Sequence, residues 1–169
     1  MLTPDEHPVV ICEYDANWPH DFARIAGRLI TSLQGLVQQI EHIGSTAVPG
    51  LAAKPIVDID VVLATTADLP EAIRRLADLG YIHEGDLGIA GREAFRWPPG
   101  EARHHLYALA QGAAELRRHL AFRDALRADP ALRDRYAALK RSLAAKTPHD
   151  RASYTEAKST FIRSTIGLS

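Results

Sequence analysis

Two aspartates and a Gly-Ser pair are the strongest candidates in this sequence for binding or catalysis. Asp58 and Asp60 interrupt the apolar run PIVDIDVVL, and Gly44 and Ser45 stand about a dozen residues before them. Because side chains alternate along a strand, both carboxylates would lie on one face, roughly 6.5 Å apart. Two like charges at that spacing are costly to bury, so some other group must compensate them.

A divalent cation is the compensation that these residue types suggest first. Two carboxylates and the phosphates of a nucleotide form the oxygen-rich, partly hydrated surroundings that Mg²⁺ prefers, with Mn²⁺ as the second choice. The alternative is structural: aspartates at the end of a sheet that bond to Lys54, to an arginine or to backbone amides. Asp-x-Asp alone is weak, so Asp58 and Asp60 become candidate catalytic residues and metal ligands only in combination with other signals.

Gly44, Ser45 and Thr46 provide the second signal, a candidate phosphate-binding turn. A glycine after a strand lets the backbone turn tightly and approach an anion, and the serine adds a hydroxyl and the amides that follow it. Alone, such a pair is most often an ordinary turn. Beside a strand that carries Asp-x-Asp, it predicts phosphate and metal sites side by side at the ends of neighbouring strands, where open α/β sheets place ligands.

Periodicity and turn residues predict the helices and strands around these candidate residues. Helical spacing and stop signals predict helices over 17–35 and 68–80, the second capped by Asp68 with Glu71 three residues later. Branched runs predict strands over 36–43 and 54–64. In the second of these the face opposite the aspartates is wholly apolar and belongs in the core.

The remaining segments complete an α/β (α+β) order. A hairpin is expected from 93–97 and 103–110 around the segment PPGEA, and helical patterns run from Ala113 to the end of the sequence. The length of 169 residues indicates a single domain. It would have a sheet-containing core at about 10–110 and a helical C-terminal part at about 112–168 packed on the sheet.

Composition and charge predict where the protein works and which partners it avoids. A hydrophobic share of 46% with no apolar run of the roughly 18 residues that a membrane span needs predicts a soluble protein. The first ten residues lack a secretory pattern and Cys12 has no second cysteine to pair with, which favours the cytoplasm. A net charge of -1 argues against nucleic acid and membrane partners; the oligomeric state stays undetermined.

Strand, Gly-Ser, about a dozen residues and Asp-x-Asp together resemble the signature of the nucleotidyltransferase superfamily typified by polymerase beta. More closely, IEHIGSTAVPGLAAKPIVDI, HHL, RRHLAFRDALR, YAALKRSLA and YTEAKSTFI resemble the GrpB-type proteins, also found fused to dephospho-CoA kinase in some bacteria. The resemblance runs from about Val10 onward and implies a nucleotidyltransferase-like mixed sheet flanked by helices. The superfamily moves a nucleoside monophosphate from an NTP to an acceptor, using metals held by three carboxylates; GrpB-type proteins bring no established reaction.

The sequence departs from that pattern at the third carboxylate. The strand expected to supply it, RHHLYALA, contains no acid. His105 and Tyr107 would share one face of this strand and His104 and Leu106 the other, so one histidine could stand in the acid's place, as a base or as a ligand of a transition metal. Otherwise the site uses a different metal or one fewer ion, Glu93 supplies the acid, or catalysis is lost and binding kept.

Basic residues outside the strands are the candidates for the remaining phosphate contacts. Lys54 precedes the aspartates, Arg123 lies on a basic helical stripe, and Lys140 and Lys158 lie on the two last helices. For Lys54 the alternative is a salt bridge to the aspartates, and for the stripe that carries Arg123 it is a solvated helix face.

The leading hypothesis is therefore a metal-dependent nucleotidyltransferase that acts on an NTP and a small-molecule acceptor, with His105 as a third catalytic residue. The alternatives are a non-catalytic binder of a nucleotide or CoA-like ligand, and a protein-interaction module with a vestigial site.

Overall fold

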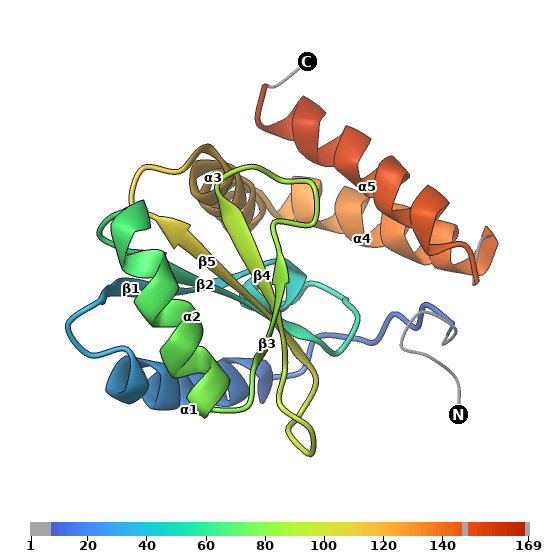
Figure 1. Cartoon of the computed structure of the whole chain (residues 1–169). Helices are drawn as coiled ribbons and strands as arrows, with labels where there is room; N and C mark the ends of the chain where they lie inside the picture. Colours follow the sequence, from blue (N-terminus) through green and yellow to red (C-terminus); the bar gives the residue numbers. More distant parts are fainter. Residues whose placement is uncertain (1–7, 147–148, 168–169) are drawn as a thin grey trace.

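The structure, a computed structural model, describes residues 8–146 and 149–167. Five strands, five α-helices and two short 3₁₀ helices follow one another in these ranges (Figure 1). Their order is α1 (Trp18–Ser32), β1 (Val37–Ile43), η1 (Ser45–Ala47), β2 (Val57–Leu63), η2 (Thr66–Asp68), α2 (Leu69–Asp78), β3 (Ile82–Gly85), β4 (Arg92–Arg96), β5 (His104–Ala110), α3 (Ala114–Ala128), α4 (Pro130–Lys146) and α5 (Arg151–Thr165).

The strands form one mixed sheet in the order β1-β2-β5-β4-β3. Strands β2 and β5 are parallel, and the other neighbouring pairs are antiparallel. In the register of the parallel pair, Asp58 lies beside His105 and Asp60 beside Tyr107. Since residues at paired positions point to the same face, these four side chains share one face of the two central strands.

Helices cover both faces of the sheet (Figure 1). The apolar face of β2 packs with α1 and α2 into the main core, which includes Leu29, Leu76, Ile59 and Val61. This confirms the core face expected from the alternation in β2. The face that carries Asp58 packs against α3, where Leu116 joins Val62 and Leu109. Helices α4 and α5 pack on α3 and on Val48 and Leu51, which follow η1, so the helical C-terminal part lies on this side of the sheet, as expected.

Two local expectations need correction. Strand β3 was not predicted, because its short sequence has exposed residues at three of its four positions and no clear alternation. The cap before α2 also differs: the backbone N–H of Thr65 donates to Asp68 Oδ2 at 3.1 Å, and Glu71 instead pairs with Arg74 and Arg75. Among the described residues, no helix is long and apolar enough to cross a membrane.

Candidate functional site

Gly44, in the turn that follows β1, leaves room for the carboxylate of Asp58. Gly44 adopts φ 71° and ψ −171°, a conformation that only glycine takes readily, and it starts the turn into η1. A Cβ atom at Gly44 would lie 2.4 Å from Asp58 Oδ2. The glycine is therefore required twice, by its backbone conformation and by the carboxylate beside it.

Asp58 and His105 form a hydrogen-bonded pair across the parallel strands. His105 Nδ1 lies 2.7 Å from Asp58 Oδ1, and the two side chains are 42% and 26% exposed. Burial opposes ionisation of Asp58, but the hydrogen bond and charge of His105 and the charge of Lys158 outweigh it and lower the pKa of Asp58. With Nδ1 donating to the carboxylate, Nε2 is the ring nitrogen left to accept a proton.

Asp60 is engaged in a different way. Its side chain has no exposed surface, and His119 Nδ1 on α3 donates to Asp60 Oδ2 at 2.7 Å. The other ring nitrogen of His119 lies 3.1 Å from Glu115 Oε1. Burial acts to lower the pKa of His119, but the two carboxylates outweigh it and raise that pKa to about 9. At neutral pH an imidazolium thus provides the counter-charge for Asp60.

Three lysines gather beside Asp58. Lys140 Nζ donates to Ser45 Oγ at 2.9 Å and to the carbonyl oxygen of Ala52. Lys54 Nζ lies 4.6 Å and Lys158 Nζ 4.9 Å from the centre of the Tyr154 ring. These contacts place the ends of β1 and β2 against α4 and α5.

Burial and mutual repulsion make these lysines easier to deprotonate. Burial first, and then the charge of Lys158, lower the pKa of Lys140 to about 7 and that of Lys54 to about 8. Burial also lowers the pKa of Lys158, against the opposing charge of Asp58. A bound anion would relieve this cost by supplying negative charge.

The lysines and Asp58 line the central one of three adjoining cavities, here named the lysine cleft, with a volume of about 450 Å³. On one side it shares Ser45, Asp58 and Lys158 with a cavity of about 430 Å³, the Phe122 cavity, whose wall includes Phe122, Tyr136 and Ile162. On the other side it shares His105 and Arg151 with a cavity of about 480 Å³, the Trp97 cavity. Tyr107 lines all three.

Most of the predicted site residues come together around the lysine cleft. Its lining includes Ser45, Thr46, Lys54, Asp58, His105, Lys140 and Lys158. Gly44 borders the Phe122 cavity. The Thr46 hydroxyl is 2.9 Å from His42 Nε2 and is buried, so a phosphate contact from Thr46 would have to come from its backbone.

Arg123, a predicted phosphate contact, and Glu93, a possible third acid, do not lie at the lysine cleft. Arg123 does not line any of these cavities; it donates to Glu41 at 2.7 Å and pairs with Asp124, because its position on α3 faces the β1 edge of the sheet. Glu93 is paired with Ala108 in the register, on the face opposite Asp58, and bonds to His83 at 2.6 Å. Glu93 therefore cannot supply the missing acid.

The structure also assigns the two neighbouring histidines. His104 is 2% exposed and lies in the core, where Nε2 is 2.7 Å from the hydroxyl of Tyr81, whereas His105 faces Asp58. Glu115 and His119 were not expected as partners of Asp60. Their spacing of four on a helix was the available signal, but the contact with β2 is visible only in the fold.

The donor set fits one metal ion better than two. Asp58 is accessible, and Mg²⁺ is commonly held by one or two carboxylates together with substrate phosphates and water. Asp60 is sealed and bonded to His119, although its Oδ1 is buried with no hydrogen-bond partner in the described structure. Within residues 8–146 and 149–167, no group of three or more His, Cys, Asp or Glu side chains is arranged to hold a metal.

Comparison with known proteins places this geometry in a family. Residues 8–167 match the family model described as GrpB protein. The chain belongs to the GrpB family. It is 38% identical to the UPF0157 protein BH1888 of Halalkalibacterium halodurans over 165 residues. This alignment covers 96% of this chain and 83% of the relative.

Solved structures agree with this membership. The crystal structure of the conserved protein GrpB from Enterococcus faecalis superposes with a TM-score of 0.83 and 32% identity, over 94% of this chain and 98% of that one. The MgGTP-bound Cid1 poly(U) polymerase superposes with a TM-score of 0.55 and 15% identity, over 77% of this chain and 43% of Cid1. This GrpB chain therefore has the nucleotidyltransferase fold, as the resemblance implied.

Proposed function

We propose that this GrpB protein transfers a nucleoside monophosphate from an NTP to a hydroxyl group of a small acceptor. The observation that carries the proposal is the arrangement of three lysines around the Asp58–His105 pair at the Gly-Ser turn. Polyphosphate is the ligand whose charge matches Lys54, Lys140 and Lys158 together, and the adjoining Phe122 cavity offers an aromatic wall for the nucleoside.

Each residue then has a defined task. The lysines and the Ser45 turn hold the β and γ phosphates and stabilise the charge that develops on the leaving pyrophosphate. Asp58 accepts the Nδ1–H of His105 and so leaves Nε2 to take the proton of the acceptor hydroxyl. The acceptor oxygen forms a bond to the α phosphorus as the bond from that phosphorus to the β-bridging oxygen breaks.

A divalent cation would enter this site with the nucleotide. Asp58 is the carboxylate that would hold it, and when bound it would neutralise phosphate charge. Asp60 has a supporting role, because its ion pair with His119 ties α3 to the strand that carries Asp58.

The test separates binding from turnover. Metal-stripped protein is titrated with each NTP by calorimetry, with and without Mg²⁺ or Mn²⁺, and pyrophosphate release is followed with candidate acceptors. The same titrations are made with Asp58→Asn and with Lys140→Met. We expect binding that weakens about tenfold or more in Lys140→Met, and turnover that Asp58→Asn abolishes. Absence of NTP binding under every metal condition would contradict the proposal.

A second candidate is a nucleotide- or CoA-like-ligand binder without turnover. It is favoured by the engagement of Asp60 with His119 and by the lack of an acid on β5. It predicts NTP binding of the same lysine dependence but no pyrophosphate release with any acceptor, so the experiment above distinguishes the two.

A further inference from the structure

The Phe122 cavity has a buried arginine in its wall, Arg92 of β4. The strand register puts the side chain of Arg92 on the face of the sheet that carries Asp58 and Tyr107. Arg92 is 9% exposed, and its guanidinium carbon lies 4.4 Å from the centre of the Tyr107 ring. A charged group buried to this extent requires compensating interactions, and those that the chain supplies are incomplete.

Arg92 has hydrogen-bonding capacity that the chain does not use. Within residues 8–146 and 149–167 its guanidinium makes no hydrogen bond and no ion pair, and its Nε is buried without a partner. The contact with the Tyr107 ring stabilises the charge of the guanidinium but does not satisfy its N–H donors. A ligand that brings an acceptor into the cavity would satisfy them.

The other polar groups at this end of the cavity add donors more than acceptors. Both carboxylate oxygens of Glu115 are engaged, because Oε1 lies 3.1 Å from His119 and Oε2 accepts from Arg118 at 2.8 Å. The Glu115 side chain is 10% exposed. Arg118 also has a buried Nε without a hydrogen-bond partner in the described part of the chain. A ligand group at this end therefore meets N–H donors in excess of free acceptors.

The rest of the cavity wall suits a flat ring. Phe122 and Tyr136 meet edge to face with their ring centres 5.1 Å apart, and Ile89 and Ile162 add aliphatic surface. The volume of about 430 Å³ is in the range of small-molecule sites. The cavity adjoins the lysine cleft, where the proposed function places the phosphates, so the nucleoside of a bound NTP would extend toward Arg92.

We propose that Arg92 recognises the base of the nucleotide, and that the protein prefers NTPs whose base carries a carbonyl oxygen where adenine and cytosine carry an amino group. The inference rests on the proposed function. The guanidinium donates to O6 of guanine or O4 of uracil, as arginine commonly does with guanine. The amino group of adenine or cytosine would face donors there and leave them unpaired. Arg92 is thus a specificity-determining residue and takes no part in the transfer step.

An anionic group of the acceptor molecule is a competing occupant of this end of the cavity. Glu115 is close enough to Arg92 for their two charges to interact. Because Glu115 partly balances the charge of Arg92 and would repel a second anion, the group that Arg92 lacks is a neutral hydrogen-bond acceptor. A carbonyl oxygen of a base meets that requirement, and a carboxylate or phosphate does not.

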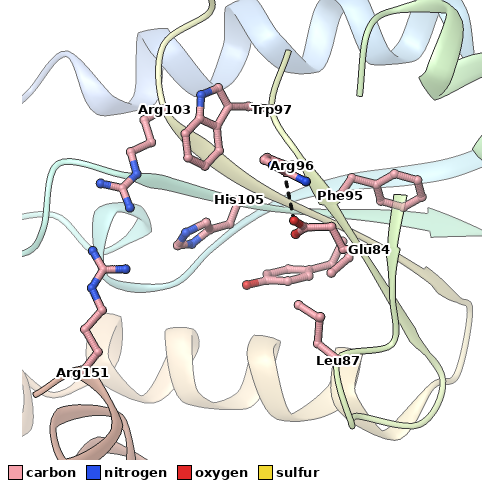
Figure 2. A pocket seen from close by; sticks show the side chains of 10 residues that line it. Glu84, Leu87, Phe95, Arg96, Trp97, Arg103, His105 and Arg151 are labelled. Atoms are coloured by element: carbon pink, nitrogen blue, oxygen red, sulfur yellow. Dashed lines mark ion pairs between the residues drawn. The ribbon is translucent and has the colours of Figure 1, made fainter. Parts of the chain in front are cut away.

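The Trp97 cavity is the competing place for the base. Figure 2 shows Glu84 beside Arg96 in that cavity, with 3.1 Å between the two charged groups. Arg103 and Arg151, which also line it, have partners in the chain. The unsatisfied donors that would select a base therefore lie at Arg92, and the two places make opposite predictions for Arg92 and Arg96 variants.

The test compares two pairs of nucleotides, ITP with ATP and UTP with CTP. The members of each pair differ at one position of the base, which carries an oxygen in the first and an amino group in the second. Each is titrated into the metal-stripped protein by calorimetry with Mg²⁺ present. The readout is the ratio of the two affinities within a pair, since a general loss of structure or phosphate binding weakens both members alike.

We expect the parent protein to bind ITP and UTP about tenfold or more tightly than ATP and CTP. In Arg92→Met this ratio should fall to within about twofold of unity, mainly because ITP and UTP bind less tightly. Arg96→Met, on the same strand and the same face, is the matched control and should keep the parental ratio. Arg92→Lys keeps the buried charge without the guanidinium fork and should also reduce the ratio, which serves if Arg92→Met does not fold.

Three results would overturn the inference. Equal affinity within both pairs for the parent protein would do so without any variant. A preference that persists in Arg92→Met and Arg92→Lys, or one that is lost in Arg96→Met instead, would place the base elsewhere. Failure of all four nucleotides to bind would overturn the proposed function as well, whereas binding without preference would overturn this inference alone.

Discussion

His119 donates from Nδ1 to Asp60 Oδ2 across 2.7 Å and so joins α3 to β2 between residues 59 positions apart in the chain. Its second ring nitrogen faces Glu115, which is held in turn by Arg118 at 2.8 Å. An aspartate that the sequence predicts as a metal ligand is thus a buried member of an ion-pair chain. The two aspartates of the motif have different environments and should have different mutant phenotypes.

Replacement of His119 should destabilise the fold. In His119→Ala the Asp60 carboxylate loses its counter-charge while it stays buried, and removal of one partner of a buried pair costs about 3–5 kcal/mol. Urea unfolding followed by circular dichroism measures the free energy of unfolding. His20→Ala, at an exposed histidine of α1, is the control and should change it by less than about 0.5 kcal/mol. A loss for His119→Ala no larger than that of the control would refute the ion pair.

The same pair predicts how stability depends on pH. The pKa of His119 is raised from 6.5 to about 9, so the folded state holds this proton more tightly than the unfolded state. The contribution of His119 to stability is therefore fully present below pH 6.5 and is lost as pH rises through about 9. The difference in unfolding free energy between the parent protein and His119→Asn, measured from pH 6 to 10, should shrink over that window. A difference that stays constant or grows would contradict this assignment.

Gly44→Ala should disturb Asp58 as well as the backbone. Its Cβ would lie 2.4 Å from Asp58 Oδ2, in addition to the strain of its positive φ. Gly35 also has a positive φ of 85°, but a Cβ there would meet no atom within 4 Å. Gly27 in α1 has neither a positive φ nor a close neighbour. We expect the midpoint of thermal unfolding to fall most for Gly44→Ala, less for Gly35→Ala, and to stay or rise for Gly27→Ala. Equal effects at positions 44 and 35 would show that the contact with Asp58 is unimportant.

Nucleotide affinity should fall as pH rises. The pKa values of Lys140 and Lys54 are lowered to about 7 and about 8, so these lysines lose charge over the range from 6 to 9. A polyphosphate favours the charged lysines, and binding should therefore take up protons and weaken with increasing pH. Calorimetry in two buffers of different ionisation enthalpy measures the uptake. Lys140→Met should reduce it, and Lys146→Met, at an exposed lysine of the same helix, should not.

Substitution of Asp58 should affect mainly turnover, and substitution of Asp60 mainly stability. Asp58→Asn keeps a side chain of the same shape at a partly exposed position, and we expect near-parental stability with loss of pyrophosphate release. Asp60→Asn removes the charge that His119 faces in the core and should lower the free energy of unfolding by about 1–3 kcal/mol. Denaturant unfolding of both variants, beside turnover assays, makes the comparison. If Asp58→Asn lowered stability and Asp60→Asn abolished turnover, the structural and catalytic roles of the two aspartates would have to be exchanged.

Most helices and strands, and the face of β2 on which the aspartates lie, could be predicted from the sequence. Alternation along β2 put Asp58 opposite the apolar core, and the Gly-Ser turn and the helical lysines were visible as residue types with a chemical use. These features depend on neighbours in the chain, where periodicity of two or 3.6 residues is a direct physical signal.

The pairing of charged side chains could not be predicted and is visible only in the folded protein. Arg123 and His119 lie four residues apart on one helix, yet the first pairs with Glu41 at the β1 edge and the second with buried Asp60. Lys140 reaches Ser45 across 95 positions of the chain, and Glu93 is turned to the opposite face by its strand register. Such contacts depend on how helices cross the sheet, which is determined by the packing of many side chains together and leaves no periodic signal in the sequence.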